Sequence, residues 1–240
     1  ILERQEALNA MVSQLIGLDD RNNWAELQSN LCSVMIAAVR RLHSGMAPIG
    51  DRLMTSLLTL IQNSAKQPTV LEDAFVAVGT VIVALEADFE KYLDAFLPFL
   101  VEGLRNHEEH QLCTISVGIV GDVCRSLAER ATKYSETLVL ALFEDLQSPV
   151  LHRNVKPHIL SCFGDIAMAI GPAFESYLPT AMAVLQQASM VQNAPDTADY
   201  EMVEYVNDLR EGIAEAYVGI VSGFRMAGKA DVLLPYMDYT

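Results

Sequence analysis

The chain has 240 residues, of which 51% are hydrophobic and 20% are charged, so it can bury a core and is not a disordered tail. Its 31 acidic and 16 basic residues give a formal net charge of −15. This excess disfavours nucleic acid as a ligand, because phosphate backbones bind through Lys and Arg, and favours basic peptides or basic protein surfaces. The 13 glycines and nine prolines are too few for a loop-dominated β fold. We expect helices.

The four cysteines, Cys32, Cys113, Cys124 and Cys162, are at least 11 residues apart, so no C-x-x-C pair is present. They are typical of buried thiols in a reducing compartment. The longest apolar run without a charge covers 12 residues, against the roughly 20 that a membrane-spanning helix needs. We expect an intracellular protein without membrane insertion. Because the chain begins with Ile1, we also expect it to be part of a longer protein.

Three landmarks recur along the chain with a constant spacing. Glycines at Gly79, Gly121 and Gly164 are 42 and 43 residues apart. A tyrosine follows each glycine after 13 residues, and a leucine follows each tyrosine after eight; these are Tyr92, Tyr134, Tyr177, Leu100, Leu142 and Leu185. A period of 40–47 residues with two helices per unit is typical of HEAT or armadillo repeats.

The apolar spacing of 3 and 4 within each unit predicts a helical hairpin. In chain order, we predict helices at 3–17, 24–43, 50–63, 70–86, 89–105, 109–129, 133–147, 152–170, 173–189, 199–225 and 230–240. The repeats are approximately 1–21 (partial), 22–66, 67–107, 108–148, 149–192 and 196–240 (partial). The predicted fold class is all-α: an α-α superhelix, or HEAT-repeat solenoid, of about five hairpins forming a single segment over 1–240.

Motifs for catalysis or for binding metals and cofactors are missing. Neither a phosphate-binding glycine loop nor a nucleophile elbow occurs. The histidines of His107-Glu-Glu-His110 are three residues apart, whereas zinc metalloproteases space them four apart on one helical face. A solvated turn explains this stretch better. We therefore expect no enzyme activity, no metal and no cofactor.

The strongest local signal is a helix near the end of the chain with an acidic face. Its carboxylates are three and four residues apart: Glu201, Glu204, Asp208, Glu211 and Glu215. Four successive like-charge pairs destabilise a helix by about 1–2 kcal/mol, which favours a docking surface for a cationic partner. A solvated face on an acidic protein is the alternative. Further acids on the predicted second helices could extend one inner acidic wall; these are Glu90, Asp94, Glu144 and Asp145.

Asp122 and Asp165 recur at one repeat position, each directly after a glycine of the landmark series. A recurring acid inside a first helix suggests a structural role. We expect each carboxylate to bond to the adjacent turn or to backbone.

Several long stretches resemble a known family. They are Asp88-Phe-Glu-Lys-Tyr92, Val117-Gly-Ile-Val-Gly-Asp-Val-Cys-Arg125, the segment 155–167, Leu185-Gln-Gln-Ala-Ser189 and the segment 199–211. In this order, and with the insertion before the acidic helix, they resemble the C-terminal half of the importin beta (karyopherin beta) nuclear transport receptors. The resemblance covers nearly the whole chain.

The resemblance implies a receptor of the cytoplasm, the nucleus and the nuclear pore complex, which carries cargo proteins. It implies an acidic inner face for the basic importin-alpha adaptor helix and an outer face for Phe-Gly (FG) nucleoporin repeats. The main Ran-GTP site would lie in repeats outside this chain. Candidate FG-pocket residues on first helices are Leu112, Ile115, Ile159 and Phe163. Ordinary inter-repeat packing is the alternative for these four. The alternative function is a structural HEAT scaffold of a phosphatase-type or kinase-type complex.

Overall fold

The computed structural model describes residue 10 and residues 25–192 and 200–239. The predicted helix 3–17 lies almost entirely outside these residues. The chain divides into two compact units, 1–122 and 123–240, with the boundary inside α6 (His110–Leu127). Every regular element in the described residues is helical, which confirms the predicted all-α class.

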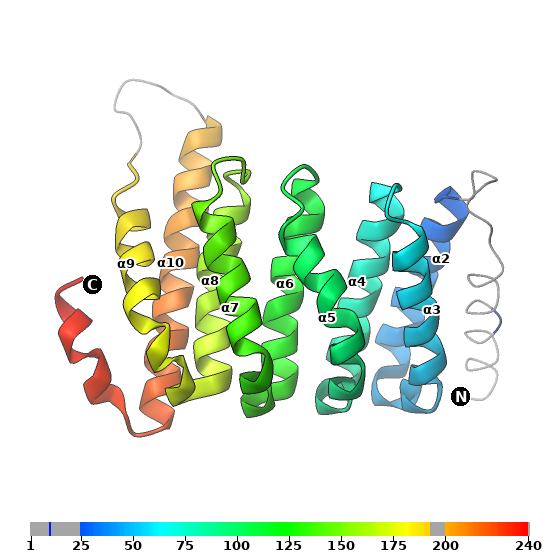
Figure 1. Ribbon diagram of the computed structural model, residues 1–240, viewed down its shortest axis with the longest axis horizontal. Helices are drawn as coiled ribbons and strands as arrows, with labels where there is room; N and C mark the ends of the chain where they lie inside the picture. The colour runs from blue at the N-terminus through cyan, green and yellow to red at the C-terminus, as the bar shows by residue number, and fades with distance from the viewer. Residues whose placement is uncertain (1–9, 11–24, 193–199, 240) are drawn as a thin grey trace. The chain divides into compact units, whose positions relative to one another are not determined.

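The first unit contains α2 (Ala25–Leu42), α3 (Gly50–Asn63), α4 (Pro68–Leu85), α5 (Glu90–Leu104) and the first part of α6. We call the even-numbered helices first helices and the odd-numbered ones second helices. First helix α2 packs on α4, and second helix α3 contacts both α4 and α5 (Figure 1). The buried rings of Phe75 and Phe96 meet edge to face, with centroids 5.5 Å apart, and join α4 to α5.

The second unit contains the rest of α6, α7 (Thr132–Gln147), α8 (Val155–Ile170), α9 (Leu178–Ser189) and α10 (Tyr200–Met226). First helix α8 packs on α7 and, over most of its length, on α10 (Figure 1). The rings of Phe143 and Phe163, with centroids 5.0 Å apart, join α7 to α8. Each unit therefore consists of first helices packed on first helices with second helices covering one side.

A strained corner ends four of the first helices. The residue after each helix has a positive φ: 46° at His43, 49° at Glu86, 50° at Ala128 and 51° at Gly171. These positions are 43, 42 and 43 residues apart, which is the repeat period. A short 3-10 helix follows each corner: η2 (His43–Ile49), η3 (Glu86–Phe89), η4 (Ala128–Ala131) and η5 (Gly171–Ser176). A positive φ stops the helix so that the chain can reverse.

Glycines let α8 and α10 approach backbone to backbone. A Cβ on Gly219 would lie 2.4 Å from the Cα of Gly164, and one on Gly223 would lie 2.3 Å from the carbonyl oxygen of Ala167. Such distances are far inside van der Waals contact, so only hydrogen fits at these positions. The landmark glycine of this repeat is therefore required by close helix packing.

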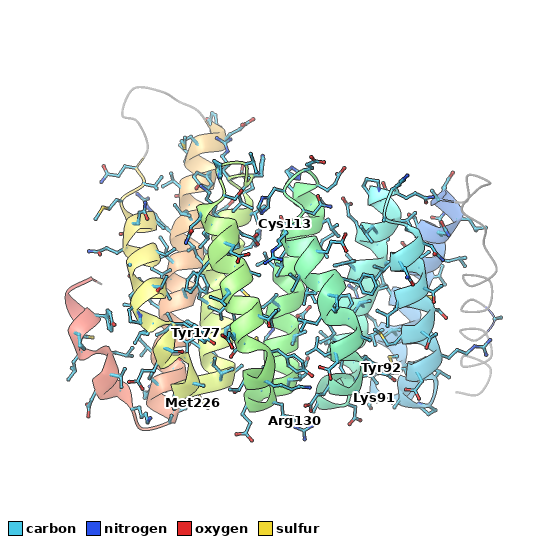
Figure 2. The ribbon with its side chains drawn as sticks, in the orientation of Figure 1. Lys91, Tyr92, Cys113, Arg130, Tyr177 and Met226 are labelled. Atoms are coloured by element: carbon cyan, nitrogen blue, oxygen red, sulfur yellow. The ribbon has the colours of Figure 1, made fainter. Side chains whose placement is uncertain are left out.

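Second helices are tied together one repeat apart. Tyr92, on α5, donates a hydrogen bond of 2.6 Å to Oδ1 of Asp51, on α3, and Lys91 pairs with the same oxygen at 2.6 Å. Figure 2 places Lys91 and Tyr92 at the start of α5. In the second unit, the hydroxyls of Tyr177 and Ser135 lie 3.5 Å apart. The recurring tyrosine thus contacts the preceding second helix in both units.

Three details differ from the sequence predictions. The last predicted helix, 230–240, is the 3-10 helix η6 (Ala230–Tyr239), which contains Pro235, a residue that cannot donate a helix hydrogen bond. The predicted helix 173–189 begins as η5 and becomes α-helical at Leu178. Asp165 pairs with Arg125 of the neighbouring first helix and not with the adjacent turn.

One segment among the described residues, Val155–Ser176, is long and apolar enough to cross a membrane. Half of its most apolar window is buried inside the protein, and the helix breaks at Gly171. A core helix passes the same test of length and hydropathy. The segment is explained by its packing between α7 and α10.

Candidate functional site

An apolar groove opens between first helices of the first unit. We call it the first-helix groove; its volume is about 370 Å³. Helices α4 and α6 form its walls, and Arg40 of α2 and His43, the first residue of η2, complete it. The lining residues are Arg40, His43, Val76, Gly79, Thr80, Val83, Ala84, Ile115, Gly118, Ile119 and Asp122.

Two glycines keep this groove open. A Cβ on Gly118 would have no heavy atom within 4 Å, so that wall faces open space. A Cβ on Gly79 would lie 3.5 Å from both Ile119 and Asp122. Val83, which is 56% exposed, presents its methyl groups to solvent in the same groove. The groove can therefore accept an apolar side chain without displacing a protein side chain.

The four candidate pocket residues do not line one common hollow. Ile115 lines the first-helix groove, whereas Leu112 lines a different hollow of the first unit and is 2% exposed. Ile159 and Phe163, in the second unit, are fully buried, and Phe163 packs against Phe143. In this structure those two side chains pack in the core of the second unit. Val83 was missed, although it lies one helical turn after Gly79 and so on the same helix face.

The five carboxylates of α10 are all exposed, on a face of the helix that adjoins its buried face. Three of them, Asp208, Glu211 and Glu215, line a hollow of about 400 Å³ between α8 and α10, which we call the α8–α10 hollow. Ser161 of α8 donates a hydrogen bond of 2.6 Å to Oε2 of Glu215. The hollow also includes His158, so its wall is acidic on α10 and polar on α8.

The first turn of α10 is fixed by a base from the loop between α7 and α8. Arg153 pairs with Glu201 at 2.9 Å, and its guanidinium lies 5.8 Å from the centroid of the Tyr205 ring. A guanidinium at this distance from an aromatic ring is attracted to the ring face. Two of the five carboxylates of α10, Glu201 and Glu215, are therefore engaged within the protein.

The expectation of one inner acidic wall is wrong in two respects. Asp145 is 1% exposed, so it cannot contact a partner, whereas its neighbour Glu144 is exposed. Helix α10 packs on α8 and so belongs with the first helices, whereas Glu144 lies on the second helix α7. Glu90 and Asp94, half-buried and exposed respectively, lie on the second helix α5 of the first unit. The predicted acids therefore occupy two kinds of helix.

The cysteines are not poised for chemistry. All four are buried free thiols, and burial raises the pKa of Cys32 and of Cys124 to about 12. A thiol with so high a pKa is protonated at neutral pH and is a poor nucleophile. Within the described ranges, no group of three or more His, Cys, Asp and Glu side chains could hold a metal ion.

Comparisons with known proteins match this chain to one family, the importin beta proteins. A family profile described as "Importin subunit beta-1-like, TPR repeats" matches residues 1–240. The period of 42–43 residues is that of HEAT repeats, because tetratricopeptide units have 34. Importin subunit beta-1 of Schizosaccharomyces pombe is 46% identical over 237 residues, which are 99% of this chain and 27% of that protein.

Solved structures give the same result. A crystal structure of importin beta in a polyethylene glycol condition matches with a TM-score of 0.89 and 39% identity, over 99% of this chain and 29% of that one. A structure described as the Kap95:Nup1 complex matches with a TM-score of 0.86 and 30% identity, over 99% and 28% of the two chains. These matches confirm the HEAT-repeat solenoid class. The chain spans little more than a quarter of the relatives that it matches.

Proposed function

The chain belongs to the importin subunit beta-1 family, and we propose that it is part of a nuclear import receptor, which binds its partners without catalysing a reaction. In this proposal the receptor carries cargo proteins between cytoplasm and nucleus and contacts nucleoporins at the nuclear pore complex. The similarity to a chain solved in a Kap95:Nup1 complex supports a nucleoporin as one partner.

The first-helix groove is the proposed contact for FG repeats. The observation that carries this assignment is an open apolar groove of about 370 Å³ whose wall lacks a side chain at Gly118. A phenylalanine ring has the size and apolar character to fill such a space, and the glycine beside it in the repeat lets the peptide backbone approach closely. A structural scaffold of a phosphatase-type or kinase-type complex would not need a groove that binds the phenylalanine of an FG repeat.

A leucine at position 118 tests the assignment. Because Gly118 faces open space on a helix, Gly118→Leu fills the groove without a clash and raises helix propensity. Burial of an aromatic side chain stabilises a complex by about 1.5–3 kcal/mol, so its exclusion should weaken binding of a labelled FG peptide by about ten-fold or more. Fluorescence anisotropy measures the affinity.

Two controls make the result specific. Ala183→Leu places the same side chain at an exposed position of α9, in the other unit, and should leave FG affinity unchanged. A peptide with serine in place of phenylalanine should not bind the unmodified protein. Equal affinity of the Gly118→Leu variant for the FG peptide would refute the assignment of the groove.

The acidic face of α10 is the proposed contact for a cationic partner such as the basic importin-alpha adaptor helix. The exposed carboxylates of the α8–α10 hollow support this second proposal. Attraction between exposed charges is screened by salt, so the affinity for a Lys/Arg-rich helix should fall steeply between low and physiological salt. A Glu211→Gln, Asp208→Asn double variant should weaken this binding, and an unchanged affinity would contradict the proposal. Ran-GTP is proposed to bind mainly through repeats outside this chain.

A further inference from the structure

The first-helix groove is larger than a phenylalanine side chain needs. An apolar cavity of about 150 Å³ is enough to hold benzene, whereas the groove has a volume of about 370 Å³. A ring that lies beside Gly118 therefore leaves room for another part of the same peptide. The polar side chains that line the groove indicate the chemistry of that part.

Two nitrogen-bearing side chains line the groove where α2 ends. Arg40 belongs to the last turn of α2, and His43 occupies the strained corner that follows, with φ 46°. Both side chains are exposed. Neither forms a hydrogen bond or an ion pair with another residue of the described ranges. The five N–H groups of the Arg40 guanidinium are therefore available to a ligand in the groove.

The other polar side chains of the groove have partners within the protein. Thr80 donates its hydroxyl to the carbonyl oxygen of Val76, one turn earlier in α4, at 3.0 Å. Asp122 is the one carboxylate among the described lining residues, and it takes part in an interaction within the protein. The chain has 31 acidic and 16 basic residues, yet Arg40 has no carboxylate partner in the part of the chain that the structure describes. Its positive charge is left for a ligand.

The neighbour of Arg40 separates two explanations for this charge. Arg40 and Arg41 both lie in the last turn of α2, where a positive charge interacts favourably with the helix dipole. Only Arg40 also lines the groove. A role confined to the helix end would be shared by both arginines, whereas a role in the groove belongs to Arg40 alone.

We propose that the first-helix groove prefers a phenylalanine flanked by an acidic residue, Asp or Glu, whose carboxylate binds Arg40. The proposal rests on the assignment of this groove to FG repeats and specifies which repeats it favours. A guanidinium donates two parallel N–H···O bonds to a carboxylate. A phosphate group typically binds to a cluster of arginines, whereas the described lining has one arginine and also carries Asp122. A carboxylate with a single charge is therefore the better match.

Three labelled peptides test the preference by fluorescence anisotropy on the complete chain. Between Gly-Ser flanks they carry Glu-Phe-Gly-Glu, Gln-Phe-Gly-Gln, and the same sequence with phosphoserine in place of both glutamines. We call them the Glu, Gln and phosphoserine peptides. At low salt the Glu peptide should bind about three-fold more tightly than the Gln peptide, because exposed ion pairs contribute little, and high salt should remove the difference.

The net charge of the protein makes this test stringent. A formal charge of −15 repels an acidic peptide, so the overall charge would produce the opposite preference. Equal or weaker binding of the Glu peptide, compared with the Gln peptide, would overturn the proposal. Tighter binding of the phosphoserine peptide than of the Glu peptide would overturn the assignment to a carboxylate.

Two arginine variants locate the preference. Arg40→Gln should reduce the three-fold ratio between the affinities for the Glu and Gln peptides to one. Both affinities are measured on the same sample, so a partial loss of folded protein does not alter this ratio. Arg41→Gln makes the same change of charge one residue away, outside the groove lining, and should keep the ratio at about three. A ratio that survives in Arg40→Gln, or that is lost equally in Arg41→Gln, would contradict the role of Arg40.

The Gly118→Leu variant separates this inference from the proposed function. If it weakens binding of the Glu and Gln peptides while the unmodified protein binds both equally, the groove accepts FG repeats without a preference, and only the present inference is overturned. If Gly118→Leu leaves binding of both peptides unchanged, the assignment of the groove to FG repeats fails, and this inference fails with it.

Discussion

Replacing Gly171 by alanine perturbs the repeated corner at the one described position where glycine occupies it. Gly171 has φ 51° and ψ −123°, a conformation that a Cβ makes unfavourable. The added Cβ would meet nothing nearer than the carbonyl oxygen of Gly223 at 3.8 Å, which is ordinary contact. The effect of this substitution therefore comes from backbone conformation and not from a clash with a neighbour.

The expected magnitude follows from two opposing contributions. A non-glycine residue held in such a conformation costs about 1–3 kcal/mol, and the lower entropy of the unfolded alanine chain offsets about 0.4–1 kcal/mol of this. The free energy of unfolding should fall by about 1–2 kcal/mol. For a chain of this size, each kcal/mol lowers the midpoint of thermal unfolding by about 2–4 °C.

Urea unfolding followed by circular dichroism measures this change, and the chain offers a matched control. Gly118→Ala is the same chemical substitution inside α6, where the Cβ has open space. It should raise the free energy of unfolding by about 0.5–1 kcal/mol, because glycine is a poor helix former. The reverse change at the corner, Ala128→Gly, should also stabilise the protein. If Gly171→Ala is neutral or stabilising, the argument from the positive φ is refuted.

Gly219→Ala should lower the free energy of unfolding by about 1–3 kcal/mol in the same assay, because its Cβ would overlap the backbone of Gly164; a neutral result would contradict the backbone contact of α8 and α10. The hydrogen bonds from Lys91 and Tyr92 lower the pKa of Asp51, so this site stabilises the fold above the ordinary pKa of the carboxyl, and that contribution is lost as pH falls through the lowered value. Tyr92→Phe should raise the pKa of Asp51 towards its ordinary value, as measured by NMR titration of its carboxyl carbon; no change would exclude the tyrosine as a donor. Burial raises the pKa of Cys32 to about 12, so the folded protein keeps the thiol protonated, and this contribution is present below the ordinary thiol pKa and lost as pH rises. Iodoacetamide at pH 8.5 should therefore modify Cys32 in urea and not in the native protein, as read by mass spectrometry, and native modification would contradict its burial.

The helices could be predicted from the sequence because each buries one face, which places apolar residues three and four positions apart along the chain. The predicted helix 50–63 coincides with α3, and the landmark glycines and tyrosines lie at inter-helix contacts such as Gly164 with Gly219 and Tyr92 with Asp51. The corners were missed because three of the four carry His43, Glu86 and Ala128, and not the glycine that usually marks a positive φ.

The candidate site was harder to predict because it depends on which face each charge occupies. Asp145 lies three residues after Leu142 and seven after Leu138, so the helical period places it on the buried stripe, but its charge suggested the surface. Helix α10 belongs with the first helices because it packs on α8, where Gly219 meets Gly164, and the acidic pattern alone does not predict that contact. The groove depends on the open space beside Gly118, which only three-dimensional packing determines.

Photo-cross-linking tests the central claim of the account most directly. An FG peptide carrying benzoylphenylalanine in place of phenylalanine is irradiated with the unmodified protein, and the modified residues are identified by mass spectrometry. The account predicts cross-links on the walls of the first-helix groove, at Val83, Ile115 and Ile119, and their loss in the Gly118→Leu variant. Cross-links confined to the second helices, or unchanged labelling of the groove in that variant, would contradict it.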